Sequence, residues 1–282
     1  MGLGVRLLKR LAVLHPRAGI GLAGRVGYWA SFAFGQRHRP RRATVRLLFG
    51  DLPDREVARI RREATSLELR NEVMNAVSRA HGFEPLLPLL RVDPGPLVRL
   101  LGEGRPVVVV AWHLGPQRHL MATLRKLEIE ALVAGGKARA RRGESGRLEV
   151  ATLEDAGLGT GFLRRAIERL ERGGIVGMAM DGTQGGRFPV DFLDRRLEVG
   201  RGIAALVRRT GAELVPLTSH WVGRSSRFES RLHEPLPKPA ADSADAQRFE
   251  AEILAATARW FEDEARRDPG NMRIRRLRRK LR

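Results

Sequence analysis

Residues 106–115 read PVVVVAWHLG, a run of four valines that leads into a tryptophan and a histidine. An unbroken apolar run of this kind is typical of a parallel strand that is buried on both faces. Ligands of open α/β sheets bind just outside the carboxyl ends of such strands. His113 stands at that point, so it is the first candidate for a catalytic side chain.

The segments on either side alternate between the patterns of helices and strands. Upstream, Asp51 and Pro53 announce a long amphipathic helix that ends at Gly82. Strands are expected at 131–134, 175–180, 214–218 and, as an antiparallel edge, 227–232. Helices are expected at 116–127, 162–170, 203–209 and 246–266. The sequence therefore predicts an α/β domain with a mixed, mostly parallel sheet covered by helices.

Basic residues are concentrated at the two ends of the chain. The formal net charge is +20, and residues 1–50 contain ten Lys and Arg with no acid, while residues 266–282 contain nine with one acid. The part between them has a net charge of only +2. A nucleic-acid groove in the core would carry its bases in that middle part, so the distribution favours an anionic membrane surface over nucleic acid as a partner.

Residues 1–40 have the pattern of a membrane-associated segment. The first part predicts a basic amphipathic helix, whose apolar positions are Leu3, Leu7, Leu11 and Leu14. Such a helix lies in a bilayer interface. The apolar stretch 18–35 is barely long enough to span a bilayer and contains Arg25, so we expect a monotopic segment. A helical hairpin packed on the domain and a transit peptide are the alternatives.

Several familiar chemistries are excluded by the sequence. The chain contains no cysteine, which removes disulfides, thiolate zinc sites and thiol nucleophiles. Gly19, Gly21 and Gly24 spell GxGxxG, but no strand precedes them and no acid follows at the distance that dinucleotide binding requires. The phosphate-loop, HExxH and GxSxG motifs are absent.

Two other strand ends offer polar side chains. Asp181 follows the strand at 175–180, and Ser219 and His220 follow the strand at 214–218. A neutral imidazole at such an end can remove a proton from an acceptor hydroxyl or amine while that group attacks an acyl donor. A single histidine can also be purely structural, so the pattern alone leaves both roles open for His113.

Bases flank the loops at the expected mouth of the site. Arg187 and Arg201 are candidates for holding a phosphate or carboxylate, although each could equally be a surface residue. The loop 137–147 contains five bases and one acid, and it could also meet a phosphate.

The run Trp112-His113-Leu114-Gly115 is followed by Asp181, by GGRFPVDFL at 185–193 and by GAELVP at 211–216. This order resembles the lipid A late acyltransferases, the lauroyl and myristoyl transferases of the lysophospholipid acyltransferase superfamily. The similarity covers nearly the whole chain, including the RLLFGDLPD stretch that ends at Asp54.

The resemblance implies a peripheral or monotopic enzyme at the cytoplasmic face of the bacterial inner membrane. It would move a fatty acyl chain from an acyl carrier protein or coenzyme A thioester to a glycolipid or related hydroxyl or amine acceptor. Neither a metal nor a bound cofactor would be needed. Bases at the rim favour the acidic carrier protein as donor.

The chain departs from the family at one motif position. The histidine of the family's His-x4-Asp/Glu motif falls on His113, but the acid falls on Arg118, whose guanidinium disfavours an imidazolium and cannot accept the ring N–H. Either Asp181 or a backbone carbonyl supports His113, or the chain has lost ordinary activity and binds a lipid or a partner enzyme. Arg118 is then a candidate for substrate binding, and His119 is expected to be a solvated helix residue.

These observations predict three parts. Residues 1–40 would form the anchoring helices, residues 41–267 the acyltransferase-like domain, and residues 268–282 a basic tail. The family tends to end in an aromatic-rich segment, whereas residues 272–282 contain no aromatic side chain. The tail is therefore expected either to touch lipid phosphates or to be solvated and disordered.

Overall fold

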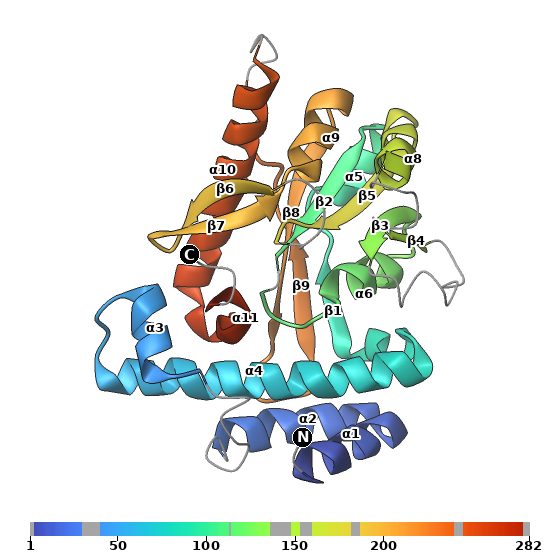
Figure 1. Cartoon of the computed structure of the whole chain (residues 1–282). Coiled ribbons are helices and arrows are strands. Elements are labelled where there is room, and N and C mark those ends of the chain that lie inside the picture. Colours follow the sequence, from blue (N-terminus) through green and yellow to red (C-terminus); the bar gives the residue numbers. More distant parts are fainter. Residues whose placement is uncertain are drawn as a thin grey trace.

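A seven-stranded sheet forms the centre of the molecule, with the strand order β1-β9-β8-β2-β5-β3-β4 (Figure 1). The computed structural model describes residues 3–29, 40–112, 114–135, 148–152, 160–181, 187–239 and 245–278. The strands of the sheet are β1 (Leu90–Asp93), β2 (Val107–Ala111), β3 (Ala131–Gly135), β4 (Leu148–Thr152), β5 (Ile175–Ala179), β8 (Glu213–Trp221) and β9 (Phe228–Leu232). All neighbouring strands are parallel except β8 and β9. The prediction of a mixed, mostly parallel sheet is confirmed.

The valine run forms β2, which lies between β5 and β8. Every residue of β2 is buried. Val108 and Val110 pack into one core layer, whereas Val107 and Val109 pack into the layer on the other face of the sheet. Because successive side chains of a strand point to opposite faces, a strand covered on both faces must be apolar at every position.

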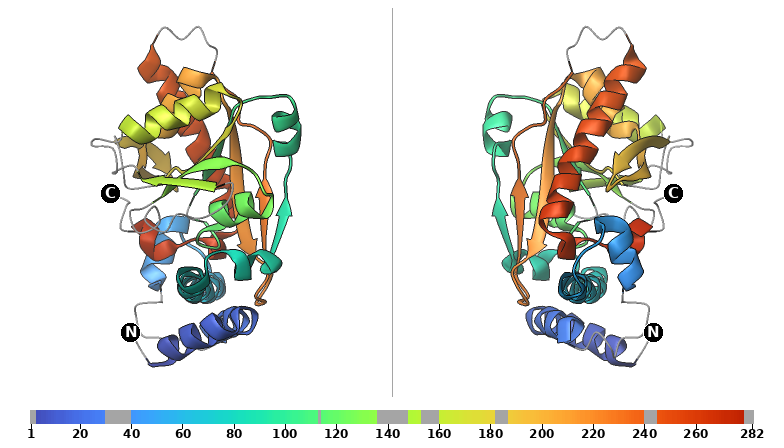
Figure 2. Two further views of the ribbon diagram at one scale, coloured as in Figure 1. Left: turned by 90° about the vertical axis from the view of Figure 1, so that its right-hand side faces the viewer. Right: turned by 90° about the vertical axis from the view of Figure 1, so that its left-hand side faces the viewer.

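Helices cover both faces of the sheet. One face carries α8 (Thr160–Glu171), α9 (Gly202–Thr210) and α10 (Ala246–Arg267). The other face carries η2 (Glu84–Leu89), α5 (Leu97–Gly102) and α6 (His119–Lys126). Figure 2 shows α10 and α5 on opposite sides of the sheet. Helix α6 begins at His119 and not at residue 116, because Arg118 adopts a left-handed backbone with φ of 75°.

The longest helix, α4 (Asp54–His81), runs beneath the sheet in the view of Figure 1. It begins after Pro53 and ends at Gly82, whose φ is 72°, so the predicted bounds are confirmed. Its first half packs into one core layer through Val57 and Ile60, and its second half packs into the other through Met74. Helix α3 (Arg42–Phe49) packs against α4. Helix α4 therefore joins the two layers at one end of the sheet.

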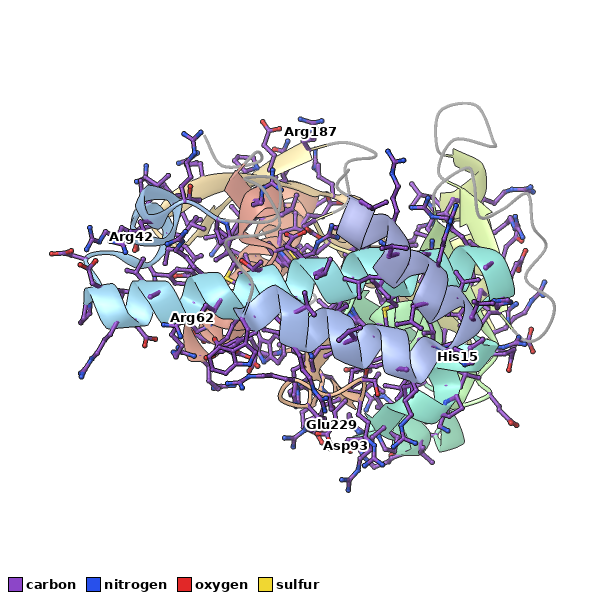
Figure 3. The ribbon with its side chains drawn as sticks, turned by 90° about the horizontal axis from the view of Figure 1, so that it is seen from below. His15, Arg42, Arg62, Asp93, Arg187 and Glu229 are labelled. Carbon is purple, nitrogen blue, oxygen red and sulfur yellow. The ribbon has the colours of Figure 1, made fainter. Side chains whose placement is uncertain are left out.

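Two helices near the amino terminus, α1 (Leu3–Leu14) and α2 (Pro16–Trp29), form a hairpin that packs on α4 (Figure 3). Glycines of the GxGxxG pattern allow close contact: a Cβ on Gly19 would collide with Ala12 of α1, and one on Gly24 would press on Arg70 of α4. No helix of the described residues is long and apolar enough to cross a membrane.

Helix α1 turns several leucines away from the protein. Its buried side consists of Val5, Leu8 and Ala12. Its exposed leucines are Leu3, Leu7 and Leu14, which are 73%, 55% and 74% exposed. The packing of the hairpin on α4 therefore leaves most of the predicted apolar face of this helix in contact with solvent.

Four strands were not predicted from the sequence. Strand β4 adds to β3, while β6 (Arg187–Phe192) and β7 (Arg195–Gly200) pair antiparallel beside α10. Strand β1 lies outside β9, so the expectation that 227–232 forms the edge of the sheet is wrong, although its antiparallel pairing with β8 is confirmed. Strand β1 has four residues, of which only Leu90 is buried, so it lacks an apolar period.

The last described residues fold back onto the core. They form η3 (Pro269–Asn271) and α11 (Ile274–Arg278). Met272, Ile274 and Leu277 are buried. Residues 268–278 thus belong to the folded body, in contrast to the solvated tail that was one of the two expectations.

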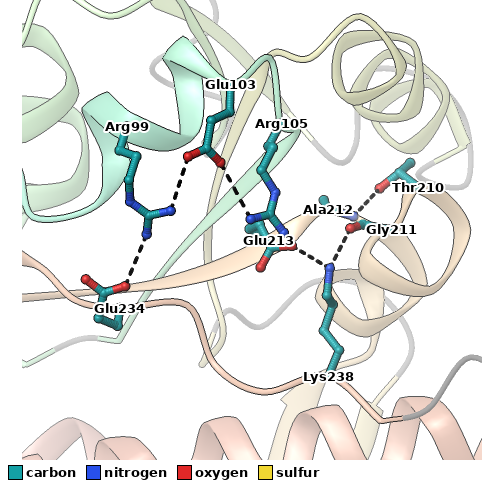
Figure 4. A network of polar contacts seen from close by, with 9 residues as sticks. All are labelled: Arg99, Glu103, Arg105, Thr210, Gly211, Ala212, Glu213, Glu234 and Lys238. Atoms are coloured by element: carbon teal, nitrogen blue, oxygen red, sulfur yellow. Dashed lines mark hydrogen bonds and ion pairs between the residues drawn. The ribbon is translucent and has the colours of Figure 1, made fainter.

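An ion-pair network holds the amino end of β8 (Figure 4). The buried carboxylate of Glu213 lies 2.6 Å from Nη2 of Arg105 and 2.6 Å from Nζ of Lys238. Glu103 and Arg99 extend the network outward. The glutamate of the GAELVP block therefore stabilises the sheet at the end opposite to the candidate site.

Candidate active site

The carboxyl ends of β2 and β5 lie side by side. Ala111 pairs with Ala179, and the amide of Met180 donates to the carbonyl of Ala111 at 2.9 Å. Asp181 follows at once and is buried, with 3% of its surface exposed. His113 itself lies outside the described residues. In the chain, His113 and Asp181 each come two residues after the paired alanines, and the two strands run about 4.8 Å apart.

The residues on both sides of position 113 are held firmly. The indole of Trp112 stacks on Phe192 of β6, with 4.7 Å between the ring centroids. Leu114 forms an isolated β-bridge with Met272. Gly115 has φ of 68°, and a Cβ there would collide with the carbonyl oxygen of Ser219. Only glycine fits this position, since both the backbone conformation and the close approach exclude a side chain.

Two asparagines of α4 bind the segment that follows. Asn71 Nδ2 donates to the carbonyl of Gly115 at 3.1 Å, and Asn71 Oδ1 accepts from the amide of Gln117 at 2.7 Å. Asn75 Nδ2 donates to Oε1 of Gln117 at 2.8 Å, and Asn75 Oδ1 accepts from Nε of Arg118 at 3.0 Å. We call this set, Asn71 and Asn75 with Gly115, Gln117 and Arg118, the asparagine clamp.

The same segment is also bound by the last part of the chain. The amide of Gly115 donates to the carbonyl of Asn271 at 2.7 Å, and Asn271 Nδ2 donates to the carbonyl of Ser219 at 2.8 Å. The neighbouring Gly270 lies against Glu63 of α4. Burial raises the pKa of Glu63, while the Arg59 guanidinium acts in the opposite direction. Segments from four parts of the chain thus meet around Gly115.

The three arginines that were predicted to bind substrate lie on separate elements. The guanidinium of Arg118 lies 6.0 Å from the ring centroid of Phe83, on the side of α4. Arg187, labelled in Figure 3, is exposed on β6 and pairs with Glu198 of β7 at 2.9 Å. Arg201, before α9, pairs at 2.9 Å with the buried carboxylate of Glu250 on α10. Each therefore has a partner within the protein.

The remaining candidates lie in different surroundings. His119 is 5% exposed, so the expectation of a solvated residue is wrong; its Nδ1 lies 2.7 Å from the carbonyl of Pro116. Ser219 is buried, with its hydroxyl 2.5 Å from that of Ser230. His220 is largely exposed and lies 3.5 Å from Glu229.

The loop 137–147 lies outside the described residues. Within the parts that the structure describes, no group of His, Asp and Glu could hold a metal ion.

Sequence reasoning missed the asparagines. Asn71, Asn75 and Asn271 are each distant in sequence from the residues that they bind. A signal did exist for the first two, because they stand four positions apart on a predicted helix, close to the apolar Met74. Polar residues on a buried helix face need partners, but the sequence does not say which.

The match to a family model agrees with the resemblance seen in the sequence. The model of the family described as bacterial lipid A biosynthesis acyltransferase matches residues 108–271, more than half of the chain. Among solved structures, the 1-acyl-sn-glycerophosphate (LPA) acyltransferase PlsC from Thermotoga maritima is similar over 86% of this chain and 94% of that chain, with a TM-score of 0.40 and 15% identity. No curated protein matches the sequence. By the match to the family model, the chain belongs to the bacterial lipid A biosynthesis acyltransferases.

Proposed function

We propose that the protein transfers a fatty acyl chain from an acyl carrier protein or coenzyme A thioester to a hydroxyl or amine of a glycolipid or related acceptor. Membership of the family supports acyltransferase activity on lipid substrates. The observation that carries the finer proposal is the register of β2 and β5, which brings the buried carboxylate of Asp181 to the strand end that His113 also follows.

In the proposed reaction His113 is the general base. Its imidazole takes the proton of the acceptor group while the acceptor oxygen or nitrogen attacks the carbonyl carbon of the thioester. The C–S bond then breaks as the carbonyl re-forms, and the imidazolium returns the proton to the departing thiolate. Asp181 stabilises the imidazolium, a role that Arg118 cannot fill.

We place the enzyme at the cytoplasmic face of the bacterial inner membrane, as a peripheral or monotopic protein. The exposed leucines of α1 support this location, because they stand beside bases on a helix without acids. At the end of α2, the guanidinium of Arg224 lies 4.0 Å from the ring centroid of Tyr28 and 4.9 Å from that of the exposed Trp29. Aromatic and basic side chains together are typical of a bilayer interface.

Arg118 also supports a second candidate function. A family member without the motif acid could keep the fold and use the same region to bind a lipid or a partner enzyme without transferring an acyl chain. In that case no thioester donor would be consumed with any acceptor, which separates the two candidates experimentally.

The test is the release of free thiol from acyl carrier protein and acyl-coenzyme A donors, in membranes that supply candidate acceptors. We expect acceptor-dependent release by the wild type and its loss in His113→Ala, while the matched variant His220→Ala stays active. Equal release by the wild type and His113→Ala would overturn the proposed role of His113. Donor binding without release in the wild type would favour the second candidate.

A further inference from the structure

The asparagine clamp spans one turn of α4. Side chains four residues apart on a helix lie on the same face, so Asn71 and Asn75 meet the same segment together. Both are buried, with 1% and 9% of their surfaces exposed. Each uses its amide nitrogen and its carbonyl oxygen at once. A buried amide that lost such partners would keep its desolvation cost without compensation, so the clamp fixes the segment against α4.

The clamp begins two positions after the candidate base in the sequence. The chain leaves β2 at Ala111 and reaches the first clamped residue at Gly115, so His113 stands midway between two fixed points of the chain. In catalysis a misplacement of about 1 Å can lower the rate about 10²-fold. The contacts to Gly115 and Gln117 include their main-chain groups, which sets the path of the backbone whatever the side chains are.

The clamp also accounts for Arg118. Because Asn75 Nδ2 donates to Gln117, the orientation of the amide directs Oδ1 toward residue 118, where it accepts from the Arg118 guanidinium. An acid at this position, as in the family motif, would face Oδ1 unless the amides of Asn75 and Gln117 both turned over. In the observed arrangement Asn75 and Arg118 form an acceptor–donor pair.

We infer that Asn71 and Asn75 are positioning residues for acyl transfer and that Arg118 is their structural partner, which leaves the carboxylate role to Asp181. The inference rests on the proposed function. On this inference, Arg118 replaces the motif acid because the segment 115–118 is held differently in this chain. The replacement does not then imply a loss of acyl transfer.

The first test compares Asn71→Ala and Asn75→Ala with Ser66→Ala. Ser66 is a suitable control because it lies on the same helix and donates one buried hydrogen bond, to the carbonyl of Gly24 at 2.8 Å, on the side of the hairpin. We expect kcat per folded enzyme to fall about 10- to 100-fold in the asparagine variants while the KM for the thioester donor stays within about twofold of wild type. Ser66→Ala should keep the wild-type kcat.

The second test uses position 118, whose side chain is only half-buried and whose variants should therefore fold. Arg118→Lys keeps a donor for Asn75 and should keep most of the activity. Arg118→Glu restores the family motif but removes the guanidinium that donates to Asn75, and we expect it to lower kcat about 10-fold or more. An increase of kcat in Arg118→Glu would overturn the inference.

The outcomes separate the inference from the proposed function. If His113→Ala is as active as the wild type, the proposed role of His113 fails and the inference fails with it. If His113→Ala is inactive but Asn71→Ala and Asn75→Ala match Ser66→Ala in kcat, the inference alone is wrong. Should one asparagine variant not fold, the other variant and the Arg118 pair still decide between these outcomes.

Discussion

Asn75 Oδ1 accepts a hydrogen bond from Nε of Arg118 at 3.0 Å, and this contact ties the motif position that departs from the family to the long helix α4. The guanidinium is thereby held on the side of Phe83. Asp181 was predicted as the acid that supports His113. Among the described residues, it is the predicted supporting acid that lies at the neighbouring strand end.

The first prediction concerns that acid. Asp181→Asn keeps the shape of the side chain but removes its charge, so the imidazolium formed during proton transfer loses its stabilisation. We expect kcat to fall about 10²-fold or more, the scale of general acid–base contributions. Thiol release at saturating donor, normalised to folded protein, measures this. An Asp181→Asn variant with wild-type kcat would show that another group supports the base.

Much of the fold could be predicted from local pattern. The valine run, the long helix and the glycine stops give strong periodic signals, and the predicted bounds of α4 match the structure. The missed strands β1 and β6 are short and partly exposed, so their burial depends on neighbours that only the folded chain brings together. For the same reason His119, which follows Gln117 and Arg118, was expected in solvent but is buried at the start of α6.

The candidate site was likewise predictable only in part. Strand ends pointed to His113 and Asp181, because the position of a residue after an apolar run is visible in the sequence. The partners of Arg118 and Gly115 were not predictable, since hydrogen bonds across more than 40 positions leave no local trace.

The second prediction tests the proposed membrane contact of the hairpin. A Leu3→Ser, Leu7→Ser, Leu14→Ser triple variant removes exposed apolar area without changing the buried face of α1. Each lost leucine side chain should cost about 1.5 to 3 kcal/mol of interfacial binding, so co-flotation with vesicles rich in anionic lipid should drop strongly. The control is Val98→Ser on α5, which is 63% exposed but lies away from the hairpin. Equal flotation of both variants would place the membrane contact elsewhere.

The third prediction concerns the network at the start of β8. Glu213→Gln leaves Arg105 and Lys238 without the buried carboxylate that they share. We expect the free energy of unfolding to fall by about 1 to 3 kcal/mol, while Glu103→Gln in the exposed part of the network should cost less than about 1 kcal/mol. Urea unfolding of the two variants gives the comparison, and equal midpoints would mean that burial adds nothing to this ion pair.

The fourth prediction is a dependence of stability on pH. Burial lowers the pKa of His233 to about 4, with a further contribution from the nearby Arg231 guanidinium. In the unfolded chain the pKa of His233 has its usual value of about 6.5. Between pH 4 and pH 6.5 the unfolded state therefore binds more protons than the folded state, and the free energy of unfolding decreases as the pH falls. His233→Gln can still reach the Thr218 hydroxyl, which lies 2.7 Å from His233 Nε2. We expect thermal melts from pH 7 to pH 4 to show a smaller loss for this variant than for the wild type. A parallel decline of both would exclude His233 as a source of the acid sensitivity.

The bridge from Met272 to Leu114 and the bond from Gly115 to Asn271 join segments that are distant in the chain. Contacts between distant segments form only after a long intervening stretch has been ordered. The loop that follows β2 is therefore secured by the folding of the whole domain, and local folding around β2 alone does not secure it.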